Sequence, residues 1–227
     1  MEVVILAGGF GHRLSTVVSN VPKPMAPVKN RPFLEFILKW LALYNVEKIV
    51  LSVGYKSESI ISFFGNEFDK IPLLYAIEKE PLGTGGGILN SINAISDENF
   101  LIVNGDTYFP IDLNVFREGH LTMGGEVTVA LRKMTDFERY GSVDIDEKNN
   151  IIHFDEKKFK KEGLINCGIY MVKKSFINGL NLPFRCSFEK DVLEKYHKGN
   201  EIKGIEFPDC FLDIGVPEDY SKADHIL

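Results

Sequence analysis

The sequence predicts an α/β fold, a Rossmann-like three-layer sandwich with a mostly parallel central sheet and a small mixed-sheet portion. In the first half of the chain, short apolar runs alternate with stretches whose apolar residues recur at helical spacing, which is typical of βαβ units. The first apolar run leads directly into a glycine-rich turn. After residue 106, apolar runs follow one another across short polar turns, which indicates mixed or antiparallel strands.

The elements of the first half follow from these patterns. Strands are predicted at residues 3–6, 48–53, 73–77 and 100–103, and helices at 33–44, 57–64 and 86–95. In parallel sheets, ligands collect at the carboxyl ends of the strands. We therefore expect Gly8, the loop after Ile77 and Asp106 to lie close together.

The second half is predicted to add strands at residues 126–132, 142–145, 151–154 and 164–172. Residues 187–197 have a helical pattern with Ser187 as a candidate N-cap. A last helix should begin at Pro217, because proline is favoured at the first helical position.

Composition and charge limit the classes of function. The 227 residues, 44% of them hydrophobic, are enough for one core, so we expect a single domain spanning residues 1–227. The net charge of −6 leaves no basic surface for nucleic acid. A phosphate-bearing ligand would have to be held locally, by a few cations and helix N-termini.

Neither an export signal nor a membrane-spanning segment is expected. The first residues, Met1 to Ile5, do not form a basic leader, and no apolar stretch approaches ~18 residues. Cys167, Cys186 and Cys210 are odd in number and widely spaced, which argues against a disulfide framework and a zinc cluster. We expect a soluble cytoplasmic protein with buried thiols and no membrane partner.

A glycine-rich loop follows the first predicted strand. It reads Leu6, Ala7, Gly8, Gly9, Phe10, Gly11, His12, Arg13, Leu14. Such a loop exposes backbone N–H groups, and Arg13 adds a cation, so a phosphate could bind there. A purely structural turn explains the glycines equally well, and Leu14 occupies the third glycine position of a dinucleotide-binding turn.

Lys23 stands between Pro22 and Pro24. Proline restricts its own backbone and that of the residue before it, so we expect Lys23 to be stiff and extended. A rigid lysine shortly after a glycine loop is a candidate phosphate ligand, and a solvated surface lysine is the alternative.

Taken together, LAGGFGHRL and the following PKPM resemble the signature of the sugar-phosphate nucleotidyltransferase family. Further segments resemble that family in the same order: EPLGTG at 80–85, NGD at 104–106, EK at 156–157, NCGIY at 166–170 and DIGVPEDY at 213–220. Their joint occurrence across most of the chain is more specific than any one of them.

The resemblance implies roles for individual residues. It implies nucleotide contacts from Leu6, Ala7, Gly8, Gly9, Gly11, Arg13, Lys23, Glu80, Pro81, Gly83, Thr84 and Asp106, and sugar-phosphate contacts from Gly105, Gly141, Glu156, Lys157, Asn166, Gly168 and Asp213. It further implies that Asp106 and Asp213 bind Mg²⁺ and that Arg13, Lys23 and Asp106 are catalytic. Residues 1–110 would mainly bind the nucleotide, and residues 111–227 the sugar phosphate.

The implied reaction transfers a nucleoside monophosphate from an NTP to a sugar 1-phosphate and releases pyrophosphate. Such transfers are catalysed by positioning and by charge stabilisation, without a protein nucleophile. Glu80 could accept hydrogen bonds from guanine, although also from uracil. The stretch 14–36 resembles the guanylyltransferases that act on D-glycero-D-manno-heptose 1-phosphate, so GTP and that sugar phosphate are the expected substrates.

Other interpretations remain open at this point. They are a uridylyl- or other nucleotidyltransferase acting on a hexose or amino-sugar 1-phosphate, and a non-catalytic nucleotide-sensing module. Glu189 and Asp191 could contact the sugar or form an exposed face. A nicotinamide-dependent oxidoreductase is disfavoured, because Glu35 falls inside the first predicted helix and not at the end of a second strand. His12 stands where the family usually has a threonine. A homodimer is a further possibility. No additional C-terminal domain is expected after Leu227.

Overall fold

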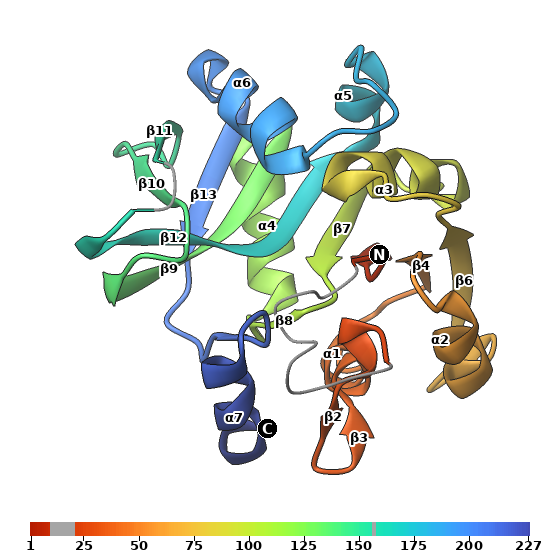
Figure 1. Ribbon diagram of the computed structural model, residues 1–227. Helices are drawn as coiled ribbons and strands as arrows, with labels where there is room; N and C mark the ends of the chain where they lie inside the picture. The colour runs from red at the N-terminus through yellow and green to blue at the C-terminus, as the bar shows by residue number, and fades with distance from the viewer. Residues whose placement is uncertain (10–20, 156–157) are drawn as a thin grey trace.

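The computed structural model describes residues 1–9, 21–155 and 158–227. Within these residues one ten-stranded sheet runs through the molecule (Figure 1). Its main path has the strand order β11-β10-β12-β7-β1-β4-β6-β5, and β9 pairs with both β12 and β13. The mixed portion expected after residue 106 therefore continues the main sheet.

The first half of the chain forms the parallel part of the sheet. Its elements are β1 (Glu2–Leu6), β2 (Pro27–Val28), β3 (Arg31–Pro32), α1 (Phe33–Leu41), β4 (Lys48–Val53), α2 (Ser57–Phe64), β5 (Glu67–Phe68), β6 (Ile71–Ile77), α3 (Gly83–Ser91), β7 (Asn99–Asn104) and β8 (Thr107–Tyr108). Strand β1 is parallel to both β4 and β7, and β4 is parallel to β6. The α/β prediction is confirmed, with α1 ending three residues earlier and α3 beginning three residues earlier than expected.

The second half adds antiparallel pairs and one more parallel strand. Its elements are α4 (Leu113–Met123), β9 (Val127–Phe137), β10 (Ser142–Ile145), β11 (Ile151–Asp155), β12 (Lys160–Lys173), α5 (Lys174–Gly179), α6 (Glu194–Tyr196), β13 (Ile202–Glu206), β14 (Leu212–Asp213) and α7 (Pro217–Ile226). Strand β12 is antiparallel to β7, β9 and β10, whereas β13 is parallel to β9. Strands β9 and β12 are longer than predicted.

Helix α4 was not predicted, although the sequence carries signals at both of its ends. The Asp112 carboxylate accepts hydrogen bonds from the N–H groups of Asn114 at 2.8 Å and Val115 at 3.3 Å, as an N-cap does. Gly124 ends the helix with a left-handed φ of 66°. The helix was not predicted because the apolar residues between these caps recur only weakly at helical spacing. Helix α5 and strand β13 were also not predicted.

The sheet is covered on both faces, which makes the three layers (Figure 1). Val3 and Ile5 point into a core shared with α1, α2, α4 and α7. Val4, between them, points into the core shared with α3, α5 and the helical segment after residue 187. The alternation follows from strand geometry, because successive side chains face opposite sides of a sheet.

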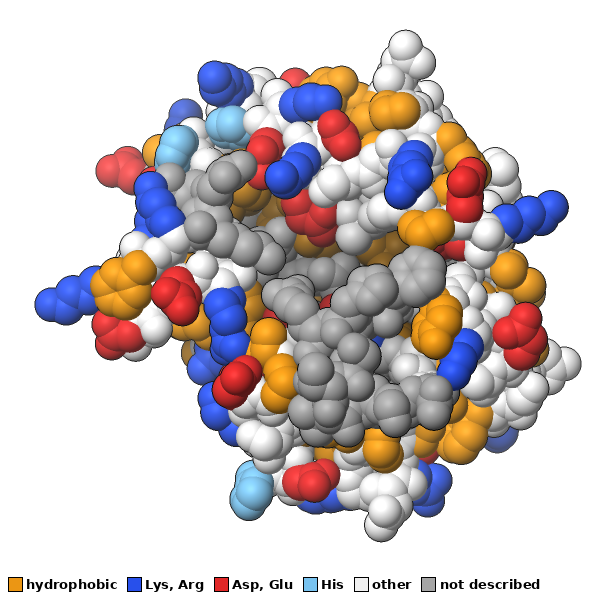
Figure 2. All heavy atoms as spheres, viewed as in Figure 1, with side chains coloured by type: hydrophobic (Ala, Val, Ile, Leu, Met, Phe, Trp, Pro, Cys, Tyr) orange, Lys and Arg blue, Asp and Glu red, His pale blue; other side chains and the backbone are white. Residues whose placement is uncertain are grey.

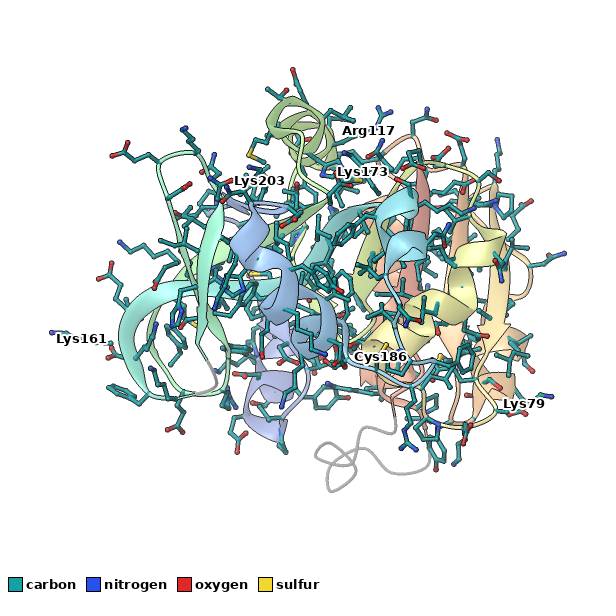
Figure 3. All side chains as sticks on the ribbon, turned by 90° about the horizontal axis from the view of Figure 1, so that it is seen from above. Lys79, Arg117, Lys161, Lys173, Cys186 and Lys203 are labelled. Atoms are coloured by element: carbon teal, nitrogen blue, oxygen red, sulfur yellow. The ribbon has the colours of Figure 1, made fainter. Side chains whose placement is uncertain are left out.

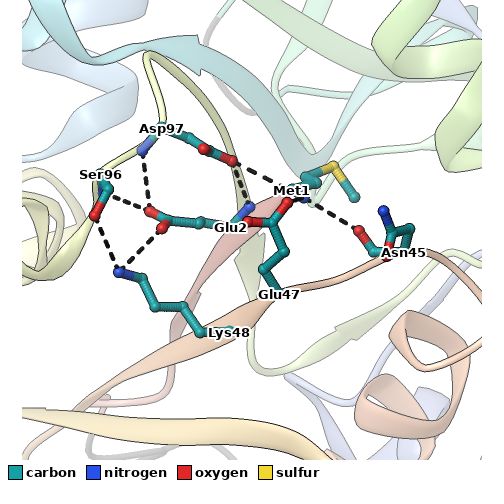
Figure 4. Close-up of polar contacts among 7 residues, drawn as sticks. All are labelled: Met1, Glu2, Asn45, Glu47, Lys48, Ser96 and Asp97. Atoms are coloured by element: carbon teal, nitrogen blue, oxygen red, sulfur yellow. Dashed lines mark hydrogen bonds and ion pairs between the residues drawn. The ribbon is translucent and has the colours of Figure 1, made fainter.

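The start of β1 is held by a buried carboxylate (Figure 4). Glu2 is 5% exposed and accepts hydrogen bonds from the N–H of Ser96 at 2.5 Å and of Asp97 at 3.1 Å. Lys48 Nζ lies 3.0 Å from its other oxygen. Burial by itself raises the pKa of Glu2, but these hydrogen bonds outweigh burial and keep the pKa below its ordinary value. The network fixes where β1 enters the sheet.

Two expectations about side chains and helices need correction. Cys167 and Cys186 are buried thiols as expected, but Cys210 is exposed. The helix predicted from Ser187 is present, and Ser187 Oγ accepts a hydrogen bond from Lys190 N–H at 3.3 Å, as a cap does. Its first turns are π-helical over Glu189–Leu193, however. Such turns occur frequently at functional sites.

Candidate active site

The carboxyl ends of the parallel strands meet at one edge of the sheet, as predicted. Gly105 N–H, after β7, donates to Leu6 O at 2.9 Å, and Ala7 N–H, after β1, donates to Ser52 O at 2.8 Å. A Cβ added to Gly105 would lie 2.8 Å from Leu6 O, so only glycine allows this approach of the two strand ends. The strand ends thus form one continuous floor for a ligand.

Glu78 lies in this floor, although it was not among the predicted site residues. Its carboxylate accepts hydrogen bonds from Ser52 Oγ at 2.8 Å and from Leu82 N–H at 3.3 Å. A Cβ on Gly8 would lie 2.5 Å from Glu78 Oε1, so the carboxylate packs directly against the glycine loop. Glu80, which was predicted to contact the nucleotide, is exposed. The position of Glu78 immediately after a strand was the signal that could have identified it.

The glycines at the start of α3 fit closely against the backbone of another segment. Gly83 has a φ of +76°, and a Cβ there would lie 2.5 Å from Cys186 O. The N–H groups of Gly85 and Gly86 donate to the same carbonyl at 3.0 and 3.3 Å. Figure 3 labels Cys186 beside this helix. These two N–H groups are therefore engaged by the protein, while Pro81 lies exposed before them.

A short two-stranded ribbon brings two aspartates together from distant parts of the chain. Strands β8 and β14 pair in antiparallel fashion, with Thr107 opposite Asp213. In addition, Ile214 N–H donates to Asp106 O at 3.1 Å. The predicted association of Asp106 with Asp213 therefore has a backbone cause.

Lys23 lies between these two carboxylates. Its ammonium makes an ion pair and hydrogen bond with Asp106 Oδ2 and lies 3.8 Å from Asp213 Oδ1. The Lys23 side chain is 10% exposed, whereas the aspartates are 37% and 26% exposed. Lys23 is thus a largely buried cation held by two acids that remain open to a ligand.

The backbone at Lys23 differs from the prediction. Residues Lys23–Met25 form a single 3-10 turn, closed by Met25 N–H to Pro22 O at 2.8 Å and Ala26 N–H to Lys23 O at 3.0 Å. The extended residue is Pro22, with ψ of 150°. The steric bias against helix before proline is overcome by these two hydrogen bonds. Pro24 costs no hydrogen bond there, because the first N–H groups of a helical turn have no partner within it.

The aspartate pair fits a magnesium ion only in company with a phosphate. Among the residues that the structure describes, no group of three or more His, Cys, Asp or Glu side chains could hold a metal. Asp106 and Asp213 supply hard oxygen ligands on two partly exposed side chains. Mg²⁺ commonly binds one or two carboxylates and completes its shell with substrate phosphates and water. The donor set is therefore adequate for such a site.

A cavity of about 630 Å³ opens beside the aspartate pair. It is lined by Asn104, Asp106, Thr107, Arg139, Tyr140, Gly141, Phe154, Asn166, Cys167, Gly168, Tyr170, Ser187, Glu189, Lys190, Glu194, Phe211, Asp213 and Val216. In Figure 2, which looks onto one face of the molecule, acidic side chains gather in a hollow of the upper middle surface. A volume of this size is typical of small-molecule sites.

The floor of the cavity is an interrupted stretch of β12. One edge of this strand pairs with β10 at residues 164–165 and with β7 from residue 169 onwards. On its other edge, the register of the pairing with β9 shifts between Asn166 and Tyr170, and Gly168 takes a φ of +73° against the side chain of Asn104. Asn166 is held there, since its Oδ1 accepts from Gly168 N–H at 2.9 Å and its Nδ2 donates to Tyr170 Oη at 3.0 Å. Asn166 and Gly168, predicted to bind sugar, thus lie on the cavity floor.

Two polar residues that belong to the NGD and NCGIY segments, but for which no contact was predicted, complete this floor. Asn104 lines the cavity, and its Oδ1 is buried without a hydrogen-bond partner in the described part of the chain. Tyr170 is 1% exposed, and burial raises the pKa of its phenol well above the ordinary range. The floor therefore presents neutral amide and phenol groups, which suit hydroxyl-bearing ligands.

Glu189 forms part of the cavity wall through two oriented hydrogen bonds. Its Oε2 accepts from Thr84 Oγ1 at 2.6 Å and from Ser187 Oγ at 2.8 Å. Thr84 Oγ1 in turn accepts from Phe188 N–H at 2.9 Å. Thr84, predicted to contact the nucleotide, therefore orients a carboxylate at the cavity. Asp191, in contrast, pairs with Lys195 at 2.8 Å and does not line the cavity.

The remaining predicted residues lie at several places in the chain. Gly8, Gly9 and Gly105 lie at the strand ends, and Gly141 lines the cavity beside Tyr140. Gly11, His12, Arg13, Glu156 and Lys157 lie outside the described residues.

No helix in the described residues is long and apolar enough to cross a membrane.

Comparison with known proteins identifies relatives over the full chain. It is 44% identical over 220 residues to D-glycero-alpha-D-manno-heptose 1-phosphate guanylyltransferase of Campylobacter jejuni, covering 97% of both chains. It is also 44% identical over 223 residues to the protein of the same name from Aneurinibacillus thermoaerophilus, covering 98% of this chain and 96% of the relative.

A solved structure and a family match agree with these relatives. The fold is similar to that of HddC from Yersinia pseudotuberculosis complexed with GMP-PN, with a TM-score of 0.88, 36% identity and coverage of 99% of this chain and 98% of that chain. Residues 2–227 match the family described as nucleotidyl transferase. The chain, which brings its paired aspartates and Lys23 together in one site, belongs to the nucleotidyl transferase family.

Proposed function

We propose that this protein transfers GMP from GTP to D-glycero-α-D-manno-heptose 1-phosphate, giving a GDP-heptose and pyrophosphate. The observation that carries the proposal is that Lys23 lies between Asp106 and Asp213, two aspartates that line the 630 Å³ cavity. The choice of GTP and heptose is supported by two relatives that are 44% identical over nearly their whole length and carry that name.

In the proposed reaction a phosphate oxygen of the sugar 1-phosphate attacks the α-phosphorus of GTP. The new P–O bond forms as the bond from the α-phosphorus to the oxygen bridging to the β-phosphate breaks, and pyrophosphate leaves with the electron pair. Both reactants are anionic, so the barrier depends on positioning and on offsetting charge. Lys23 would neutralise the phosphates that meet at the aspartate pair, and Arg13 would neutralise the leaving pyrophosphate.

Asp106 and Asp213 would hold a Mg²⁺ ion in this scheme. When bound, the ion would offset negative charge on the phosphates of both substrates. Lys23 contacts the same two carboxylates that would hold the ion. Lys23 therefore offsets one of the two negative charges of the carboxylate pair. When the ion binds these carboxylates, the Lys23 ammonium would turn toward the substrate phosphates.

Glu78 is proposed as the residue that distinguishes guanine, in place of Glu80. A carboxylate can accept hydrogen bonds from guanine N1–H and from its exocyclic amine. Glu78 is oriented by Ser52 Oγ and Leu82 N–H and lies against Gly8 in the floor of the strand ends. Glu80 has the same chemistry but an exposed position.

The sugar would occupy the cavity floor and wall. Asn166, Gly168, Gly105 and Gly141 are proposed to surround it, and Glu189 to accept hydrogen bonds from its hydroxyls. Glu156 and Lys157 keep their predicted contact with the sugar phosphate. Residues 1–110 would thus mainly bind the nucleotide and residues 111–227 the sugar phosphate within one domain, and a cytoplasmic location stays a prediction.

The proposal is tested by a substrate matrix. The protein is incubated with Mg²⁺, each of the four common NTPs and the 1-phosphates of heptose, mannose, glucose and N-acetylglucosamine, and pyrophosphate release is measured. We expect the highest kcat/KM with GTP and the heptose, and a Lys23→Met variant controls for contaminating activity. Preferred use of UTP with a hexose would contradict the substrate assignment, and no reaction with any pair would contradict the activity.

A further inference from the structure

The C-terminal helix α7 contacts segments on both sides of the candidate active site. It follows β14, which carries Asp213, and lies below β8 in Figure 1. On one side it contacts residues 138–141, the connection between β9 and β10 whose last members line the cavity. On the other side it contacts the β2–β3 hairpin, which follows the turn that carries Lys23.

The contact with residues 138–141 is an ion pair. Arg139 Nη2 makes a hydrogen bond and ion pair with Asp219 Oδ2, and Nη1 lies 3.8 Å from Glu218 Oε2. Asp219 is 9% exposed, and Lys222 Nζ donates to its other oxygen at 2.9 Å. A carboxylate that is largely withdrawn from water and held by two cations should occupy one well-defined position.

Aromatic packing next to the ion pair fixes the residue that follows Arg139 at the wall of the cavity. The ring of Tyr140 meets that of Phe211 edge to face, with centroids 5.4 Å apart, and Phe211 meets Phe109 in the same way at 5.9 Å. Burial, with a further contribution from Asp213 and Asp219, raises the pKa of Tyr140, so its phenol stays neutral. Tyr140 and Gly141 line the cavity, so the Arg139–Asp219 ion pair sets part of the cavity wall.

The contact with the hairpin lies close to Lys23 along the chain. Tyr220, the residue after Asp219, donates its hydroxyl hydrogen to Pro27 O. Asp224, one turn further along α7, accepts a hydrogen bond from Lys29 N–H at 2.9 Å. Pro27 is only four residues after Lys23, and Ala26 between them closes the 3-10 turn. The same helix therefore holds the lysine segment and the sugar-side segment.

We propose that α7 is a strut that positions both sides of the active site. Asp219, acting through Arg139, sets residues 139–141 against the sugar phosphate, and Tyr220 sets the turn that carries Lys23 against the nucleotide. These are positioning residues, because they act through other groups. The kinetic part of this inference rests on the proposed function, whereas the structural part does not.

Two variants separate the two sides of the strut. Asp219→Asn removes the charge that holds Arg139, and we expect KM for the sugar phosphate to rise about 3- to 10-fold, with kcat and KM for GTP within about 2-fold of the wild type. Asp219→Glu, which keeps the negative charge, should have a KM for the sugar phosphate close to that of the wild type. Tyr220→Phe should instead lower kcat about 3- to 10-fold with little change in KM for the sugar phosphate.

Lys222→Ala is the matched control, because the Lys222 side chain is 63% exposed, so that its ion pair with Asp219 contributes little, and Arg139 stays in place. It should match the wild type in all three parameters. A sugar-phosphate KM that rises in Lys222→Ala as much as in Asp219→Asn would overturn the role of Arg139. A rise in Arg139→Gln that is absent in Asp219→Asn would show that Arg139 binds the substrate directly, which also overturns the strut.

Amide hydrogen exchange tests the structural part without turnover. Peptides covering residues 138–142 should exchange faster in Asp219→Asn than in the wild type and at the wild-type rate in Lys222→Ala, with thermal unfolding confirming that each variant is folded. Unchanged exchange in Asp219→Asn contradicts the strut whatever the enzyme does. A wild type that releases no pyrophosphate with any substrate pair contradicts the proposed function alone.

Discussion

The ammonium of Lys23 contacts the carboxylate of Asp106, although the two residues are 83 positions apart in the sequence. Lys23 lies in a 3-10 turn that follows β1, and Asp106 lies just after β7. Asp213 joins them through the β8–β14 ribbon. The single ammonium therefore offsets one of the two carboxylate charges and leaves a net negative charge at the pair. This pairing leads to the first two predictions.

Replacing Lys23 by Met should lower kcat by about 10²- to 10³-fold, as loss of one preorganised charge-stabilising group does in other enzymes. The loss comes from the missing ammonium, so Lys23→Arg should retain more activity than Lys23→Met. Steady-state pyrophosphate release measures both. Lys198→Ala, at an exposed lysine that does not line the cavity, is the control and should keep the wild-type rate.

Removing divalent metal with EDTA should abolish activity, and added Mg²⁺ should restore it. Asp213→Asn should raise the Mg²⁺ concentration needed for half-maximal activity about 10-fold or more, because one of two proposed carboxylate ligands loses its charge. The exposed Asp144→Asn is the control. A metal requirement that is unchanged in Asp213→Asn would remove this aspartate from the metal site.

Glu78→Gln should reduce kcat/KM for GTP by about 5- to 100-fold, since a bidentate contact to a base edge discriminates by roughly 1–3 kcal/mol. The effect on other NTPs should be smaller, so the preference for GTP should narrow. Glu80→Gln is the matched control two residues away and should behave like the wild type. The opposite result, with Glu80→Gln losing GTP preference, would return the base-reading role to Glu80.

The buried histidine of α4 should make the protein less stable in acid. His120 is 1% exposed, and its Nε2 lies 2.9 Å from Asn99 Oδ1, which only accepts, so Nε2–H donates and Nδ1 accepts from Thr128 Oγ1 at 2.8 Å. Burial, followed by the nearby Lys173, lowers the pKa of His120 from 6.5 to about 4.

The sign of the effect follows from proton linkage. The unfolded state takes up a proton on this histidine below pH 6.5, and the folded state only near pH 4. The free energy of unfolding should therefore fall between these values, by up to about 3 kcal/mol. Urea unfolding at a series of pH values measures this. His120→Asn should flatten the dependence, and the exposed His225→Gln should not; equal slopes in His120→Asn and the wild type would contradict the assignment.

Local patterns were enough to predict most of the first half of the fold. Strand β4 and helix α2 have the predicted bounds, because apolar runs and helical spacing are properties of neighbouring residues. Helix α4 was missed although Asp112 and Gly124 cap it, and β13 became a strand by pairing with β9, which lies far away in the sequence. Pairing between distant segments has no local signature.

By itself, the sequence determined the α/β class and the order of its first elements, and its motifs selected Lys23, Asp106 and Asp213. Only the tertiary structure decided which carboxylate lies in the floor of the strand ends. Glu78 and Glu80 have the same side chain, and Glu78 differs because β6 ends beside Gly8, where no Cβ blocks it. The contacts of α7 with Arg139 and Pro27 were likewise decided by packing, since residues far apart in the chain meet only when the layers assemble.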